Sequence, residues 1–273
     1  MGENGGNFPP GNMESRMRRL PASLGFAMAA ILAGGLLACL PASTSASDNA
    51  VPKFSTFASA DDLAAEVKLL VVDLEKAIVN EEEYKSQVEG RFIRDGNTIT
   101  LLAIALGLHD QDSPLKPHAN AVAAAARKLT ETKDFATTKQ AIADLEAAIG
   151  GQGGSELKWG KVAPLGSLMK DEVPNVNTKM KTGLRHFKTR AGEAAANAAT
   201  VALIAENAML YVADTKKPAE GVKWTEFAAQ MRSAASEVAA KAHAGDEAGA
   251  NVALDKLNES CTACHKVFNP EKQ

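Results

Sequence analysis

The sequence predicts an all-α protein made of two up-down four-helix bundles. Apolar residues recur at intervals of three and four, Ala, Leu, Lys and Glu are abundant, and aromatic residues make up only 5% of the chain. Gly, Pro and polar residues cluster at 110–117, 150–164 and 214–221, which predicts breaks between helices. Short loops between helices of similar length favour antiparallel neighbours, and hence the up-down arrangement.

Eight helices are expected, four on each side of a glycine-rich boundary at 150–154. Asp134 and Asp246 are expected to be N-caps. Pro174 falls inside a predicted helix and should disturb it, because proline lacks an amide donor and clashes with the preceding turn. The predicted domains are 51–150 and 155–273, and the predicted helices are 61–80, 84–108, 118–129 and 134–149, then 162–186, 189–212, 222–243 and 246–267.

Residues 1–46 have the features of a signal peptide. Three arginines precede an apolar run over 20–40, and the small residues of 43–46 offer a cleavage site. Glycine and proline interrupt and shorten the apolar run, which disfavours a retained membrane anchor. Leu37-Ala38-Cys39 resembles a lipobox, so a lipoprotein anchored through Cys39 is the alternative to a free periplasmic protein. The mature form is expected to have no membrane span.

The segment Cys261-Thr262-Ala263-Cys264-His265 matches C-x-x-C-H, the pattern that attaches a c-type haem. A spacing of three on a helix places both thiols on one face, where they can form thioether bonds with the porphyrin. The histidine that follows can bind the iron. We therefore expect one covalent haem c held by Cys261, Cys264 and His265. A redox-active dithiol or half of a zinc site would use the same cysteines, but zinc needs two further ligands.

The two halves look like diverged copies of one unit. The apolar pattern of 142–149 repeats over 254–261, at the same offset that relates the two expected N-caps. At this offset Gln152 and Gly153 take the places of the second cysteine and the histidine. The first half is therefore expected to bind no haem. A chance likeness between two alanine-rich amphipathic helices is the other explanation.

The second half resembles class II c-type cytochromes, the cytochrome c′ group, in which a four-helix bundle carries C-x-x-C-H near its C-terminus. The resemblance rests on Trp224 opening the third helix, on the alanine-rich run to Ala244-Gly245-Asp246, and on Ser260 to His265. Many members have a basic residue four positions after the axial histidine, where this chain has Asn269. Reactivity that depends on that cation therefore does not carry over.

The resemblance also implies two candidates for the other side of the iron. In the low-spin branch of the group a Met on the first helix completes the coordination, and Ser167 to Asp171 resembles that segment, which implies Met169 as a metal ligand. Alternatively, Lys161 to Leu165 aligns with the five-coordinate pattern, in which Leu165 faces an open iron. A six-coordinate haem suits electron transfer, whereas an open face binds gases such as NO or CO.

The sequence thus predicts a periplasmic electron carrier, with a gas-binding cytochrome c′ as the alternative, and no enzyme. Peroxidase-like turnover would prefer a distal His and Arg pair, which the sequence does not supply. The formal net charge of −3 argues against nucleic acid as a partner and leaves docking to a periplasmic redox protein open. A homodimer is also left open. Four histidines are interpreted as surface residues, namely His109, His118, His186 and His243.

Overall fold

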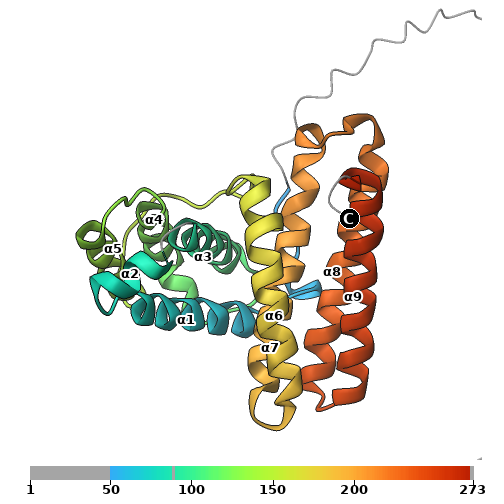
Figure 1. Ribbon diagram of the computed structural model, residues 1–273, viewed down its shortest axis with the longest axis horizontal. Coiled ribbons are helices and arrows are strands. Elements are labelled where there is room, and N and C mark those ends of the chain that lie inside the picture. Colours follow the sequence, from blue (N-terminus) through green and yellow to red (C-terminus); the bar gives the residue numbers. More distant parts are fainter. Residues whose placement is uncertain (1–49, 88–89, 271–273) are drawn as a thin grey trace, which may run out of the picture. The chain divides into compact units, whose positions relative to one another are not determined.

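The computed structural model describes residues 50–87 and 90–270, and in these ranges all regular structure is helical (Figure 1). The predicted all-α class is confirmed, whereas the predicted signal peptide and Cys39 lie outside the described residues. The longer helices are α1 (Ala60–Ala77), α3 (Arg91–Leu108), α4 (Ala119–Leu129), α5 (Phe135–Ala148), α6 (Val173–Arg185), α7 (Phe187–Ala208), α8 (Gly221–His243) and α9 (Glu247–Phe268). The shorter elements are η1 (Phe54–Thr56), α2 (Glu81–Gln87), η2 (Lys116–His118), the π-helix η3 (Ser167–Glu172), η4 (Met209–Asp214) and η5 (Pro218–Glu220).

Helices α6 to α9 of the second half lie side by side (Figure 1). Each packs on the next in sequence, and α6 also contacts α9. The turn between α8 and α9 contains Gly245 at φ 72°, a conformation that glycine adopts without strain. Asp246 follows and caps α9, accepting a hydrogen bond from the Gly249 N–H at 2.8 Å. The predicted N-cap is confirmed, and so is Asp134, which accepts from the first turn of α5 in the same way.

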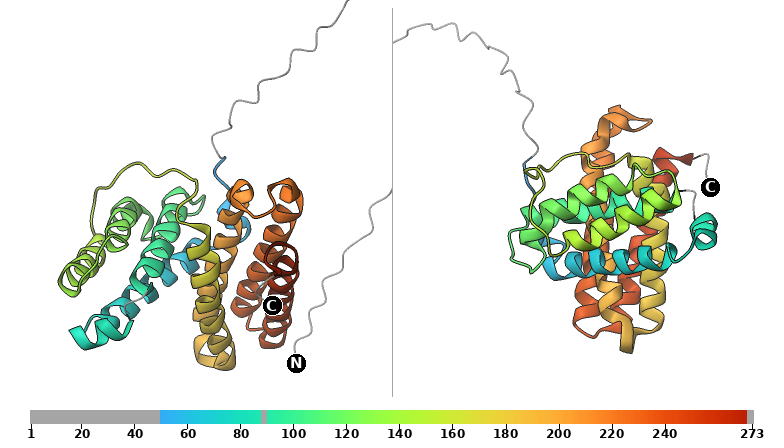
Figure 2. Two further views of the ribbon diagram at one scale, coloured as in Figure 1. Left: turned by 45° about the horizontal axis from the view of Figure 1, so that its top comes forward. Right: turned by 90° about the vertical axis from the view of Figure 1, so that its left-hand side faces the viewer.

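The first half has four longer helices in a similar order of contacts. Helix α3 packs on α1 and α4, α4 packs on α5, and α1 contacts α5. The predicted helix 84–108 is wrong in one respect, because the structure divides this stretch into α2 and α3. Gly90 separates them at φ 93°, outside the range of a right-handed helix. Figure 2 shows that α1 runs across α6 and α7 rather than along them.

Helix α7 lies at the centre of the described fold. Every residue from Ala194 to Ala205 is buried, so this stretch has no solvent-facing side. The helix packs on α6 and α8, and also on α1 and α3 of the first half. Its small alanine side chains let helices approach from both sides, and one apolar core runs through both halves. By length and composition alone, the helical segment Phe187–Asp214 could cross a membrane. In this fold, 78% of its most apolar 18-residue stretch is buried inside the protein.

The connection between the halves is packed against this core. Trp159 is buried, and its ring meets that of Phe54 edge-on, with the centroids 5.2 Å apart. The Asn207 side chain on α7 donates to the Gly160 carbonyl at 2.8 Å. The stretch that follows the glycine-rich segment is therefore fixed to the core at several points. The domain limits at 51–150 and 155–273 stay predictions.

The disturbance expected at Pro174 takes the form of a π-helix. The Val173 N–H bonds to the Leu168 carbonyl, five residues back, so the chain makes a wide turn over η3. Helix α6 then begins at Val173, and Pro174 lies in its first turn, where no intrahelical amide donor is required. π-turns are rare and often lie at functional sites. Met169 lies within η3 and is therefore a candidate for a functional role.

Candidate haem site

The two cysteines of the motif lie one turn apart on α9. Both are half-buried and neither forms a disulfide. Leu254, Leu257 and Phe268 of the same helix are buried and form its apolar stripe. Cys261 packs at the edge of the main core. Cys264 instead contacts a smaller apolar group further along the helix.

This smaller group, the cysteine-side cluster, brings α7, α8, α9 and η3 together. The Trp224 indole N–H donates to the Ala208 carbonyl at 2.8 Å, and its ring meets Phe268 edge-on with the centroids 5.2 Å apart. The aromatic side chains are thus held in a defined orientation. The buried members are Ala208, Trp224 and Phe268, and the half-buried members are Leu165, Met169, Val212, Phe227, Cys264 and Val267.

Both residues proposed for the other side of the iron belong to this cluster. Met169 is half-buried and contacts the main core as well as the cysteine-side cluster. Leu168 beside it is 1% exposed and belongs to the main core, so neighbouring residues of η3 face different surroundings. Leu165 is half-buried in the cysteine-side cluster. The fold therefore brings Met169 and Leu165 into one apolar group with Cys264, which is distant from both in the sequence.

His265 lies on the outside of α9. Its side chain is exposed, and it makes no hydrogen bond or ion pair with any other residue in the described ranges. Its backbone carbonyl accepts from the Asn269 N–H at 2.8 Å, which keeps the end of the helix intact. The imidazole is therefore free to bind a metal.

The surroundings of Cys261 and Cys264 keep both thiols protonated. Burial raises the pKa of Cys261, and burial together with the neighbouring Cys261 raises the pKa of Cys264 to about 11. Since the thiolate is the reactive form, this pair is poorly suited to dithiol exchange. Within 50–87 and 90–270 no three His, Cys, Asp or Glu side chains group as metal ligands, so the alternative zinc site lacks the ligands it needs.

The residues present fit a covalently attached haem. Cys261 and Cys264 offer two unpaired thiols on one helix face. Six half-buried side chains around Trp224 and Phe268 form an apolar surface that is partly open to solvent, as an apolar ring requires. A thioether and an imidazole are present nearby as ligands for iron.

The interpretation of the histidines is correct for the exposed His186 and His243, and wrong for His109. His109 is 2% exposed at the end of α3. Its Nδ1 accepts from the Gln111 N–H at 3.0 Å, which places the ring proton on Nε2, 3.1 Å from the Ala58 carbonyl oxygen. It is a structural residue that joins two loops. The half-buried His118 places its Nδ1 2.6 Å from the Gly151 carbonyl oxygen.

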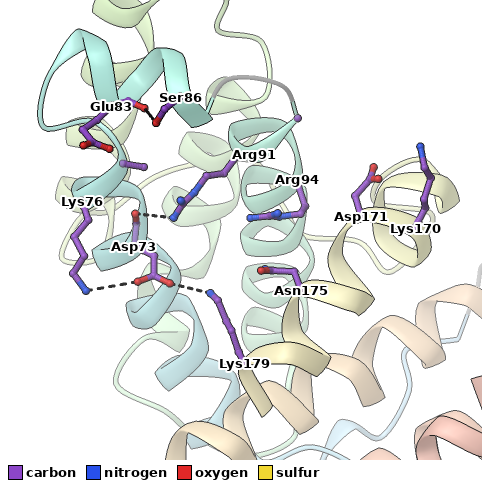
Figure 3. Close-up of a pocket in the computed structure, with 12 residues that line it drawn as sticks. Asp73, Lys76, Glu83, Ser86, Arg91, Arg94, Lys170, Asp171, Asn175 and Lys179 are labelled. Atoms are coloured by element: carbon purple, nitrogen blue, oxygen red, sulfur yellow. Dashed lines mark hydrogen bonds and ion pairs between the residues drawn. The ribbon is translucent and has the colours of Figure 1, made fainter. Parts of the chain in front are cut away.

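The sequence reasoning missed a polar cleft of about 1140 Å³ between α1 to α3 and the segment of η3 and α6 (Figure 3). Asp73 lies at its centre, with Lys179 Nζ 2.9 Å and Lys76 Nζ 3.7 Å from its carboxylate. Arg91 donates to the Asp73 carbonyl at 3.0 Å. The charged lining residues are Asp73, Lys76, Glu83, Arg91, Arg94, Lys170, Asp171 and Lys179.

Three carboxylates are buried near this cleft, namely Glu66 of α1, Asp95 of α3 and Glu172 of η3. Burial raises the pKa of both Glu66 and Glu172 to about 7. A signal for them exists in the sequence, because each falls on an apolar stripe of its helix, as Glu66 does between Leu63 and Leu70. A charged residue in such a position requires a partner or a proton.

Comparisons with protein-family models, with curated proteins and with solved structures find no match to this chain. The haem-attachment motif and the surroundings of its cysteines are the features of this chain that indicate a function.

Proposed function

We propose that this chain is an exported c-type cytochrome that binds one covalent haem through Cys261 and Cys264 and transfers electrons. In the same proposal, His265 and Met169 would be ligands of its iron. The observation that carries it is the cysteine-side cluster, in which Cys264 of α9 and Met169 of η3 contact the same apolar group. The family resemblance implies a Met from the first helix of the bundle near the cysteines of the last, and the shared apolar group supports this part of the proposal.

The haem, when bound, supplies one-electron redox chemistry at its iron. Cys261 and Cys264 would fix it by two thioether bonds, and His265 would donate an imidazole nitrogen. Met169 would add a soft thioether sulfur, which favours the ferrous state and so raises the reduction potential. Trp224 and Phe268 would keep water away, which reduces the rearrangement that accompanies electron transfer.

Export to the periplasm belongs to the same proposal. It is supported by the arginines and apolar run of residues 1–46, and by the absence of further cysteines in the sequence after Cys39 other than those of the motif. A periplasmic redox protein is the partner that this function requires.

A gas-binding cytochrome c′ is the second candidate function. It is favoured by one observation, that Leu165 lies half-buried in the same cluster as Met169. An apolar Leu165 facing the iron would leave its sixth position open to NO or CO. The two candidates differ in which of these side chains faces the iron.

We also propose that the two halves arose by duplication and that only the second carries haem. The support is the matching order of helix contacts, α1-α3-α4-α5 beside α6-α7-α8-α9, and the equivalent N-caps of α5 and α9. At the offset that relates these caps, the first half has Gln152 and Gly153 in place of a cysteine and the histidine.

Covalent haem tests the proposed function. The full chain, produced with its leader in a host that attaches haem to exported proteins, should gain the mass of one haem that survives acid extraction and denaturing gels. Cys261→Ser with Cys264→Ser should lose it. The matched control is Thr262→Ala, an exposed residue between the cysteines, which should keep the haem. A wild-type chain without covalent haem, or a double variant that retains it, would overturn the proposal.

A further inference from the structure

We infer that the first half of the chain controls iron ligation by holding η3, and that Arg94 and Asn97 of α3 are positioning residues for Met169. The inference rests on the proposed function, since it takes Met169 as an iron ligand. The first half has no haem-attachment motif, and holding η3 would be its role in the proposed site.

Helix α3 contacts both ends of η3. The Asn97 side-chain amide donates to the Ser167 hydroxyl oxygen at 3.1 Å. Arg94 Nε lies 3.0 Å from a carboxylate oxygen of Glu172. Ser167 and Glu172 are the first and last residues of η3, and Met169 lies between them. Two contacts from one helix thus hold the segment on either side of the proposed ligand.

The contact between Arg94 and Glu172 is buried, so breaking it costs free energy. Glu172 has no exposed surface, and neither of its carboxylate oxygens receives a well-aligned hydrogen bond within the described residues, so Arg94 is the main charge that compensates it. The guanidinium is itself fixed, since it lies 2.8 Å and 2.7 Å from Asp95 Oδ1 through Nε and Nη2. Moving Glu172 away from Arg94 would leave a charge or an unsatisfied carboxyl in the core.

The segment needs such support because its own hydrogen bonding is weak. A π-turn is less stable than an α-turn, and Pro174 directly after it contributes no amide donor. The polar cleft borders η3 through Lys170 and Asp171, so packing does not enclose this side of the segment (Figure 3). Contacts with α3 therefore add to the apolar packing that holds Met169 in place.

The test compares two contact variants with a matched control. Asn97→Ala removes the bond to Ser167, and Arg94→Gln removes the guanidinium that lies 3.0 Å from the Glu172 carboxylate. The control is His243→Ala, which removes a different contact between the same halves, the 2.9 Å contact of His243 Nε2 with the Asp62 carboxylate, without contacting η3. All are made in the full haem-loaded chain, singly and with the two contact variants combined.

Two measurements are made on the same samples. Amide hydrogen exchange over 165–173 should become about two- to tenfold faster in the combined variant, the change expected from losing one or two ordinary hydrogen bonds. The ferric spectrum should gain a high-spin fraction, and CO should bind faster by a similar factor. His243→Ala should leave both measurements at the wild-type value. If the combined variant does not fold, Asn97→Ala alone decides by the same criteria.

The outcomes separate this inference from the proposed function. Faster exchange with a larger high-spin fraction, absent in His243→Ala, supports the positioning role. Unchanged exchange, or faster exchange with unchanged ligation, overturns the positioning role while the haem function stands. A wild-type protein without haem, or with a haem that Met169 does not ligate, overturns the inference through its premise.

Discussion

The residues around Cys264 form an apolar cluster, and some of them carry groups that can bind a metal. Met169 and Leu165 lie in the same half-buried cluster, and they differ in one chemical respect, since only Met169 has a sulfur lone pair to donate. On the proposed function, this difference distinguishes an electron carrier from a gas-binding protein. A substitution at each position therefore separates electron transfer from gas binding.

Met169→Ala should convert a six-coordinate low-spin haem to a five-coordinate high-spin one, because it removes the sixth ligand. The reduction potential should fall, since the thioether that favours ferrous iron is gone. Leu165→Ala is the matched control and should leave a low-spin spectrum. Absorption spectra and CO-binding rates check both variants. Sensitivity to Leu165→Ala with no effect of Met169→Ala would favour the gas-binding alternative.

Glu66 should make stability depend on pH. Burial raises its folded pKa to about 7, so its contribution to stability is fully present below the unfolded pKa and is lost as pH rises through 7. Glu66→Gln cannot ionise, and its free energy of unfolding relative to wild type should therefore increase by up to about 3 kcal/mol between pH 5 and pH 8. Denaturant unfolding at both pH values measures this. Glu82→Gln, on the exposed surface of α2, should show no such change, and an equally flat result for Glu66→Gln would refute the account.

At the scale of helices, most boundaries could be predicted because the signals are local. Asp134 and Asp246 mark the starts of α5 and α9, and apolar periodicity marks their buried faces. The division at Gly90 and the π-turn of η3 depend on contacts with other helices, which the sequence pattern does not record. The same reason applies to the site, where the motif identifies Cys264 but tertiary packing determines its apolar neighbours.

Asp246→Ala should destabilise the protein by about 1 kcal/mol, because the amide of Gly249 loses the acceptor that caps α9. Asp246→Asn keeps a capping oxygen and should cost less. Thermal or denaturant unfolding followed by circular dichroism gives the comparison. Equal effects of the two substitutions would mean that the ion pair of Asp246 with Lys241, rather than the cap, stabilises this turn.

At the scale of the described chain, α7 links the two halves through one core. Helices α1 and α3 pack on one side of it and α6 and α8 on the other, and the stretch that contains Trp159 packs against the same core. Loss of the first half would expose the apolar face of α7 that α1 and α3 contact. A glycine cluster is a local signal, and it predicts a boundary at 150–154. The shared core instead depends on contacts between residues distant in sequence, which no local signal indicates.

The mature chain should therefore unfold in one cooperative transition. Far-ultraviolet circular dichroism reports both halves, and absorbance of a haem bound as proposed would report the second; the two should give the same midpoint in denaturant. Two separated midpoints would show that the halves are stable independently and that the contacts of α7 with α1 contribute little.

We propose a haem bound covalently through Cys261 and Cys264, with His265 and Met169 as ligands of its iron. The near-infrared absorption spectrum of the ferric wild-type protein is the decisive measurement, because a Met-to-iron charge-transfer band appears only when sulfur is a ligand. We predict this band together with a low-spin visible spectrum, and its loss in Met169→Ala. A high-spin spectrum without the band, or a purified protein with no haem absorbance, would contradict the account.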